Sequence, residues 1–200
     1  MTRRETLLTL MSALLTAASS AAAGGSDPTL AAIGQPIRDG EAAAGVMLGE
    51  PEAAVMRTLG RRPDRRYDYY RKEEWRLDLW EVAPADREWI VVLDFVYLLG
   101  GTGVAAVRGA AMRRGAGPAP YSGRTQRGYG LFDGAARLRQ LYGEPDAAFT
   151  FGPGDPSYLW YRRAGLVVRP EFQADYRVAH FVVLPRDLAA IEARRLVLAQ

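Results

Sequence analysis

The sequence contains no cysteine and only one histidine, His180. Without cysteine the chain has no disulfide framework, no thiolate zinc site and no cysteine nucleophile, and one histidine cannot supply a two-histidine metal motif. Lysine is also scarce, since Lys72 is the only one among 26 basic residues, which 23 acidic residues nearly balance. The formal charge of +3 is far below that of a nucleic-acid-binding domain. We therefore expect no catalytic residue set, metal, cofactor or nucleic acid partner.

The first 23 residues have the three parts of a secretory signal peptide. Arg3 and Arg4 form a basic start, residues 7–18 are apolar, and Ala21 and Ala23 provide a small-residue cleavage site. The apolar run is too short to remain as a membrane-spanning helix, and no cysteine follows it to carry a lipid. We expect a periplasmic or secreted protein, exported by the general or the twin-arginine route, with no stable membrane insertion in its mature form.

Two stretches of the remaining chain can be overlaid, residues 45–64 on residues 128–146. Each predicts a short helix with an apolar stripe that ends at a glycine, Gly60 or Gly143. A Pro-Asp pair follows each helix, and then three runs with the composition of strands. We predict an α+β fold of two tandem copies, each a short helix packed on a small antiparallel β-meander.

The signals at the helix ends and along their stripes are similar in the two copies. Pro51 suits the first helical position of the first helix, and Asp133 suits the N-cap of the second. The expected stripes are Val55, Met56 and Leu59 in the first copy and Leu138, Leu141 and Tyr142 in the second.

The strand-like runs are Trp75–Val82, Trp89–Leu98 and Val104–Arg108 in the first copy, and Tyr158–Arg163, Leu166–Phe172 and Arg177–Leu184 in the second. Leu188, Ile191 and Leu198 then recur at near-helical spacing, which favours a C-terminal helix. The chain divides into a signal peptide (1–23), an N-terminal segment (24–44), a first module (45–110), a Gly/Pro-rich linker (111–127), a second module (128–185) and a C-terminal tail or helix (186–200).

The repeated features are a helix ending in Leu-Gly or Tyr-Gly, a Pro-Asp pair, an aromatic first strand and an acidic residue before phenylalanine. They occur at Leu59-Gly60, Tyr142-Gly143, Pro63-Asp64, Pro145-Asp146, Asp94-Phe95 and Glu171-Phe172. This pattern resembles the SmpA/OmlA (BamE-like) family of small periplasm-facing modules. Its tandem form is similar to the beta-lactamase inhibitory proteins, in which two such modules present a concave sheet. The resemblance implies a binding module without catalysis.

Strand alternation predicts which residues face the helices. In the first strand Trp75, Leu77 and Leu79 form the apolar set, so the residues between them are expected on the outer face. That face would have the tryptophan and arginine content of a protein interface. Its candidate residues are Arg76, Asp78, Trp80, Trp160, Arg162, Arg169 and Glu171. The alternative, which burial of large aromatics favours, is that Trp80 and Trp160 belong to a core shared by the two modules.

We expect an exported, soluble, non-enzymatic protein that binds another protein of the bacterial envelope, with the partner's identity and the oligomeric state left open. A binder of a small ligand or envelope polysaccharide is the alternative, because arginine and aromatic residues are abundant. A carboxylate-based hydrolase has less support. His180 lies among apolar residues, which predicts a core or half-buried histidine, and the Tyr67–Tyr70 cluster predicts a solvated loop or edge strand more than a stacking site.

Overall fold

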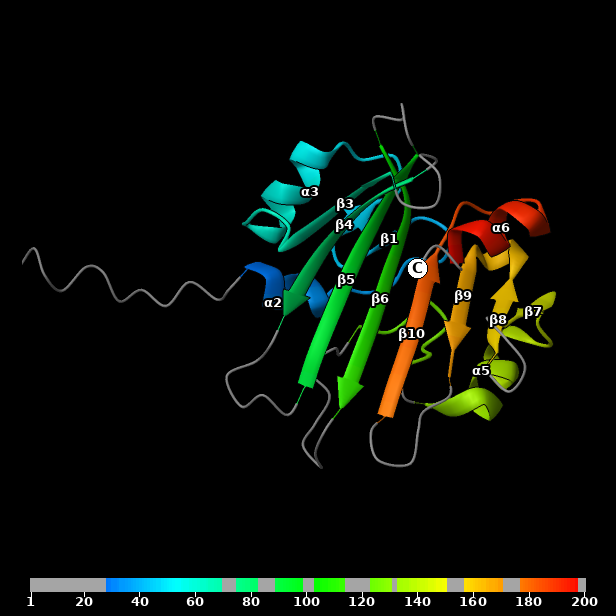
Figure 1. Ribbon diagram of the computed structural model, residues 1–200. Helices are drawn as coiled ribbons and strands as arrows, with labels where there is room; N and C mark the ends of the chain where they lie inside the picture. The colour runs from blue at the N-terminus through cyan, green and yellow to red at the C-terminus, as the bar shows by residue number, and fades with distance from the viewer. Residues whose placement is uncertain are drawn as a thin grey trace, which may run out of the picture.

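The computed structural model describes residues 28–69, 75–82, 89–98, 103–113, 123–130, 133–150, 157–170 and 177–197. The expected signal peptide and Glu171 lie outside these residues. The centre of the fold is an eight-stranded antiparallel sheet with the order β3-β4-β5-β6-β10-β9-β8-β7 (Figure 1). The α+β class expected from the sequence is confirmed.

The strands of the sheet are β3 (Arg65–Tyr69), β4 (Trp75–Val82), β5 (Trp89–Leu98), β6 (Val104–Arg113), β7 (Ala147–Phe149), β8 (Tyr158–Tyr161), β9 (Leu166–Arg169) and β10 (Arg177–Val183). The helices are α2 (Pro28–Ile33), α3 (Glu52–Leu59), α5 (Gly134–Tyr142), the 3-10 turn η1 (Arg162–Ala164) and α6 (Ala190–Val197), and β1 (Ala42–Ala43) pairs with β2 (Val46–Met47). Within the described ranges no helix is long and apolar enough to cross a membrane.

The sheet consists of two four-stranded meanders, β3–β6 and β7–β10, which meet where β6 pairs with β10. Their register runs from Val107 opposite Val183 to Arg113 opposite Arg177. Near the middle of this pairing, a Cβ atom added to Gly109 would lie 2.2 Å from the ring of Phe181. Only glycine therefore leaves room for the aromatic ring beside the neighbouring strand at this junction.

One face of the sheet is covered by α2, α3, α5 and the segment before α5 (Figure 1). Val55 and Leu59 of α3 and Leu138 of α5 are fully buried on this side, with the rest of their stripes partly buried. The expected helix stripes are therefore confirmed. The sheet residues that meet them are Trp80, Leu93, Phe95, Tyr97, Val104, Val107, Leu159, Tyr161, Leu166, Val168, Phe181 and Val183.

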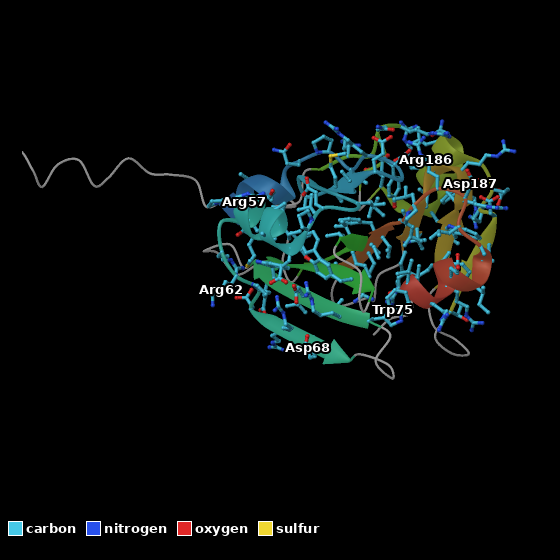
Figure 2. The ribbon with its side chains drawn as sticks, turned by 90° about the horizontal axis from the view of Figure 1, so that it is seen from above. Arg57, Arg62, Asp68, Trp75, Arg186 and Asp187 are labelled. Carbon is cyan, nitrogen blue, oxygen red and sulfur yellow. The ribbon has the colours of Figure 1, made fainter. Side chains whose placement is uncertain are left out.

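The opposite face of the sheet packs against α6, which lies across the sheet from α2 and α3 (Figure 2). The C-terminal helix is thus confirmed. Of its expected apolar residues, Leu188 packs against the core on this face, Ile191 does not, and Leu198 lies outside the described residues. Ala193, Leu196 and Val197 face the sheet, whereas the side chain of Ile191 is 71% exposed. Because α6 spans only residues 190–197, its inward face is set by the short residue Ala193 and the last turn.

Several local features differ from the sequence expectations. Pro51 precedes α3 as its N-cap and does not occupy the first turn. Asp133 stands at the N-cap of α5, but its carboxylate accepts a hydrogen bond from the Gly130 N–H (2.8 Å) and makes none to the helix. The edge strand β7 and the packed N-terminal segment, with Ile33 and Ile37 buried, had no clear sequence signal.

Candidate functional site

The candidate residues named from the sequence do not share one face of the sheet. Arg76, Asp78 and Trp80 lie on the face covered by α2, α3 and α5, which we call the helix side. Trp160 and Arg169 lie on the face covered by α6, which we call the α6 side. Arg162 lies in η1 and is exposed, and Glu171 falls outside the described residues. The expected common outer face is therefore wrong.

The error lies in the orientation of β4. Trp75 and Leu77, expected beneath the helix, pack in the core on the α6 side. Figure 2 shows Trp75 there. Trp80, expected outside, is fully buried in the core on the other face, with Val55 and Leu59 of α3. Trp80 Nε1 donates to the carbonyl of Arg61 (3.2 Å). Because this sheet is covered on both faces, the more apolar set of a strand no longer identifies the helix side. Both tryptophans are buried, as the alternative held, but in separate clusters.

Arg76 and Asp78 belong to a closed ring of two arginines and two carboxylates on the helix side. The Asp78 side chain is 0% exposed and accepts two hydrogen bonds from Arg66, from Nε (2.7 Å) and Nη2 (3.0 Å). Arg76 Nη2 donates to Asp78 (3.3 Å) and contacts Glu52 (2.8 Å). Arg66 closes the ring at Glu52. The positive and negative charges of the ring cancel.

The ring joins α3 to the edge of the sheet. Glu52 is the first residue of α3, Arg66 lies on β3, and Arg76 lies on β4 with its guanidinium 4.1 Å from the centre of the Tyr97 ring. The bond from Arg66 holds the pKa of the Glu52 carboxyl below its usual value. A Glu52 carboxyl with a lowered pKa suits a structural clamp better than a general acid, which needs a raised pKa.

A second polar cluster lies on the α6 side of the sheet, where the two halves meet. Arg169 on β9 stands opposite His180 on β10, and Arg108 on β6 stands opposite Val182, one step along the same face. The hydroxyl of Tyr158 is 3.2 Å from Nδ1 of His180, and the Arg169 guanidinium lies 5.6 Å from the centre of the Tyr158 ring. We call Arg108, Tyr158, Arg169 and His180 the cationic cluster.

His180 is neutral at neutral pH. Burial, with the positive charges of Arg169 and Arg108, lowers its pKa to about 4. The half-buried histidine expected from the sequence is confirmed, and its environment is more positive than the sequence indicated. Sequence reasoning missed Arg108 and Tyr158 as companions of Arg169, because only the register of β6, β9 and β10 brings them together.

Arg169 retains unused hydrogen-bonding capacity. Its Nε atom is buried, and among the described residues no acceptor lies within hydrogen-bond distance of it. A buried guanidinium N–H without an acceptor costs free energy, which an incoming oxygen recovers. The cationic cluster thus offers an arginine donor to a negatively charged group, beside a neutral imidazole that is hydrogen-bonded to a phenol hydroxyl.

No three histidine or acidic residues of the described ranges lie close enough together to hold a metal ion. No protein-family model, curated protein or solved structure matches this chain.

Proposed function

We propose that the chain is an exported, non-enzymatic protein of two BamE-like modules that binds an acidic protein of the bacterial envelope through the α6 side of its sheet. The observation that carries the proposal is the cationic cluster, in which buried Arg169 Nε meets no acceptor in the described part of the chain. A partner carboxylate would accept from this arginine in a half-buried setting, where charge-assisted bonds are strongest.

Matching contacts in the two halves support the two-module part of the proposal. After α3, the N–H of Asp64 donates to the carbonyl of Leu79 (2.8 Å), and the Asp64 carboxylate accepts from the N–H of Glu81 (2.7 Å). After α5, the N–H of Asp146 donates to the carbonyl of Trp160 (2.8 Å). Its carboxylate accepts from the N–H of Arg162 (2.7 Å). We call each arrangement an aspartate clamp.

The strand register around the two clamps also matches. The residue after Asp64 stands opposite Leu79, and the residue after Asp146 stands opposite Trp160. Both aspartates come from the Pro-Asp pairs that follow the helix-ending glycines. One helix, one Pro-Asp turn and a four-stranded meander therefore recur in the same order, as a tandem duplication requires.

The ionic ring supports the non-enzymatic part. Its two carboxylates, Glu52 and Asp78, each form ion pairs with both Arg66 and Arg76, so both are engaged in contacts that join α3 to the sheet. The hydrolase expected as a minor alternative would need a carboxyl group with a raised pKa beside a second, ionised one.

The test compares Arg169→Gln with the control Arg163→Gln, which removes an exposed arginine six residues earlier. Mature chains capture partners from periplasmic extract, and the captured protein is then purified and titrated against each variant. We expect Arg169→Gln to weaken binding at least tenfold and Arg163→Gln to leave it unchanged, with both variants folded by circular dichroism. Equal binding by both would exclude the cationic cluster.

The same preparation tests export. When the chain is expressed from Met1, N-terminal sequencing of the protein recovered from the periplasm should show a start near Gly24. An intact Met1 on the recovered protein would contradict export.

A further inference from the structure

A groove lies between the last strand of the sheet and α6. It measures about 400 Å³ and is lined by Ala148, Phe149, Thr150, Ala190, Ile191 and Arg194. β7 forms its one wall and the first turns of α6 form the other, at the end of the sheet farthest from β3 (Figure 1).

β7 is an edge strand. It pairs with β8 on one side, and no described strand pairs with it on the other. Alternate backbone N–H and C=O groups of an edge strand point outward and form a template for one more strand. β7 is a short edge of three residues, and its sequence Ala-Ala-Phe has none of the lysine, proline or inward charge that also protect an edge.

The groove has an apolar floor and a cationic rim. Phe149 is 6% exposed at its base, while Ile191 on the α6 wall is 71% exposed, an unusual position for a large aliphatic side chain. Arg194 lies one helical turn after Ile191, also exposed. An apolar side chain of a ligand would cover Ile191 and Phe149, and a carboxylate would meet Arg194.

We propose that an extended segment of an acidic partner protein binds in this groove as an additional strand on β7, with an apolar side chain against Ile191 and an acidic one at Arg194. The inference rests on the proposed function in one respect, that the chain binds a protein, and it names a site separate from the cationic cluster. An edge strand beside a helix selects an extended peptide, because main-chain hydrogen bonds supply affinity and alternate side chains supply specificity.

Charge argues for a different protein over a second copy of this chain as the occupant. Two copies paired edge to edge through β7 would be related by a two-fold axis and would bring both Arg194 side chains to the same groove. An acidic strand meets no such repulsion.

The probes are two synthetic peptides whose charged ends are removed by capping. In both, the residues that would face α6 alternate between valine and a charged residue, aspartate in one peptide and lysine in the other, and the residues between them are threonine. Each is titrated into the mature full-length chain and followed by backbone amide chemical shifts and hydrogen exchange. We expect the aspartate peptide to bind at least tenfold more tightly than the lysine peptide and to slow amide exchange within Ala147–Phe149. Equal affinities, or protection confined to other strands, would overturn the proposal.

Two variants with a matched control localise the site. Ile191→Glu should weaken the aspartate peptide at least tenfold, and Arg194→Glu should reverse the preference between the two peptides. Met47→Glu makes the same change at another exposed apolar residue, 47% exposed and distant from α6 in sequence, and should have no effect. Loss of binding in Met47→Glu as well would show a non-specific charge effect and overturn the groove.

Two further readouts separate this inference from the proposed function and from self-association. Arg169→Gln should leave peptide binding unchanged; if it abolishes peptide binding, the peptide sits on the cationic cluster and the groove assignment is wrong. If Ile191→Glu instead converts a dimer to a monomer in sedimentation velocity while the peptide fails to bind, the occupant is a second copy, and the proposal is again wrong. Retained peptide binding with no partner capture would overturn the proposed function alone.

Discussion

The two halves of the sheet share a backbone frame and differ in the side chains that secure it. Each half has a helix ending at a glycine of positive φ, Gly60 or Gly143, and an aspartate clamp that ties the next turn to the following strand. In the first half the helix is then joined to the sheet by a four-residue ionic ring. The backbone of each half is thus held by a helix-ending glycine and by hydrogen bonds that main-chain N–H groups donate to an aspartate. The side chains on the faces of the sheet differ between the halves.

The second half secures its helix with a single buried carboxylate instead. The hydroxyl of Tyr142, at the end of α5, donates to Asp39, whose Oδ1 and Oδ2 both lie 2.9 Å away, and Asp39 is 5% exposed. Burial raises the pKa of this carboxyl despite the tyrosine bond. The charged side chains of the second half gather instead on the α6 side, where Arg169 and His180 lie near Arg108 of the first half. The comparison teaches that equivalent frames can place polar groups on opposite faces.

The largest effect is expected from breaking the ring of the first half. Asp78→Asn leaves Arg66 and Arg76 without their buried counter-charge and should lower the free energy of unfolding by about 3 to 5 kcal/mol, measured in urea. The control Asp187→Asn removes a carboxylate 71% exposed and 3.8 Å from Arg162, and should cost less than about 1 kcal/mol. If the two substitutions cost the same, the ring is not what secures α3.

The next largest effect is expected in the pH dependence of stability, which depends on His180 in the second half. His180 has a pKa of about 4 when folded, against its ordinary 6.5, so the unfolded chain binds more protons between these values. Stability from neutral His180 is therefore complete above about pH 6.5 and is lost as the pH falls toward 4, by about 3 kcal/mol at most. His180→Gln should remove this part of the acid sensitivity.

The measurement is the difference in unfolding free energy between pH 7 and pH 4.5 for wild type and His180→Gln. Glu52 and the other carboxylates contribute equally to both proteins and cancel in the comparison. An identical pH dependence in the two proteins would mean that His180 is not desolvated as the cluster requires.

The smallest effect is expected from removing the aspartate clamps, which the two halves share. Asp64→Ala and Asp146→Ala each remove a carboxylate that accepts a backbone N–H, as a helix cap does, and each should cost about 1 to 2 kcal/mol. Asp64 also pairs with Arg61, so its loss should be the slightly larger of the two. Glu144→Ala, at a side chain 82% exposed, is the control for thermal unfolding. A cost confined to one clamp would break the equivalence of the halves.

Sequence reasoning recovered the parts of this fold that local chemistry determines. Gly60 and Gly143 stop their helices, Val55, Leu59 and Leu138 face the sheet, and the runs that became β4, β5, β8 and β10 were recognised. The predicted orientation of β4 was wrong because the side chains of Arg76 and Asp78 lie on the helix side, where the ionic ring neutralises their charges. A strand with charged residues on its buried side gives the alternation signal of the opposite face.

The candidate site was recovered only in part. Arg169 was named from its position between apolar residues, but Arg108 and His180 reach it through the pairing of β6 with β10 and of β10 with β9. Such register depends on contacts between residues distant in sequence. β7 is too short to be recognised from composition, and the exposure of Ile191 depends on how α6 docks on the sheet.

The pairing of β6 with β10, where Gly109 meets Phe181, has the largest loop-closure entropy cost of any strand pairing in the sheet. Every other neighbouring pair in the sheet joins strands that follow each other in sequence, whereas β6 and β10 pair residues from 64 (177 − 113) to 76 (183 − 107) positions apart. A loop of this length must close before any bond of that pairing forms. The close packing of the Phe181 ring on Gly109 contributes to offsetting that ordering cost. The residue of the sheet without a side chain therefore lies at the pairing that joins its two halves.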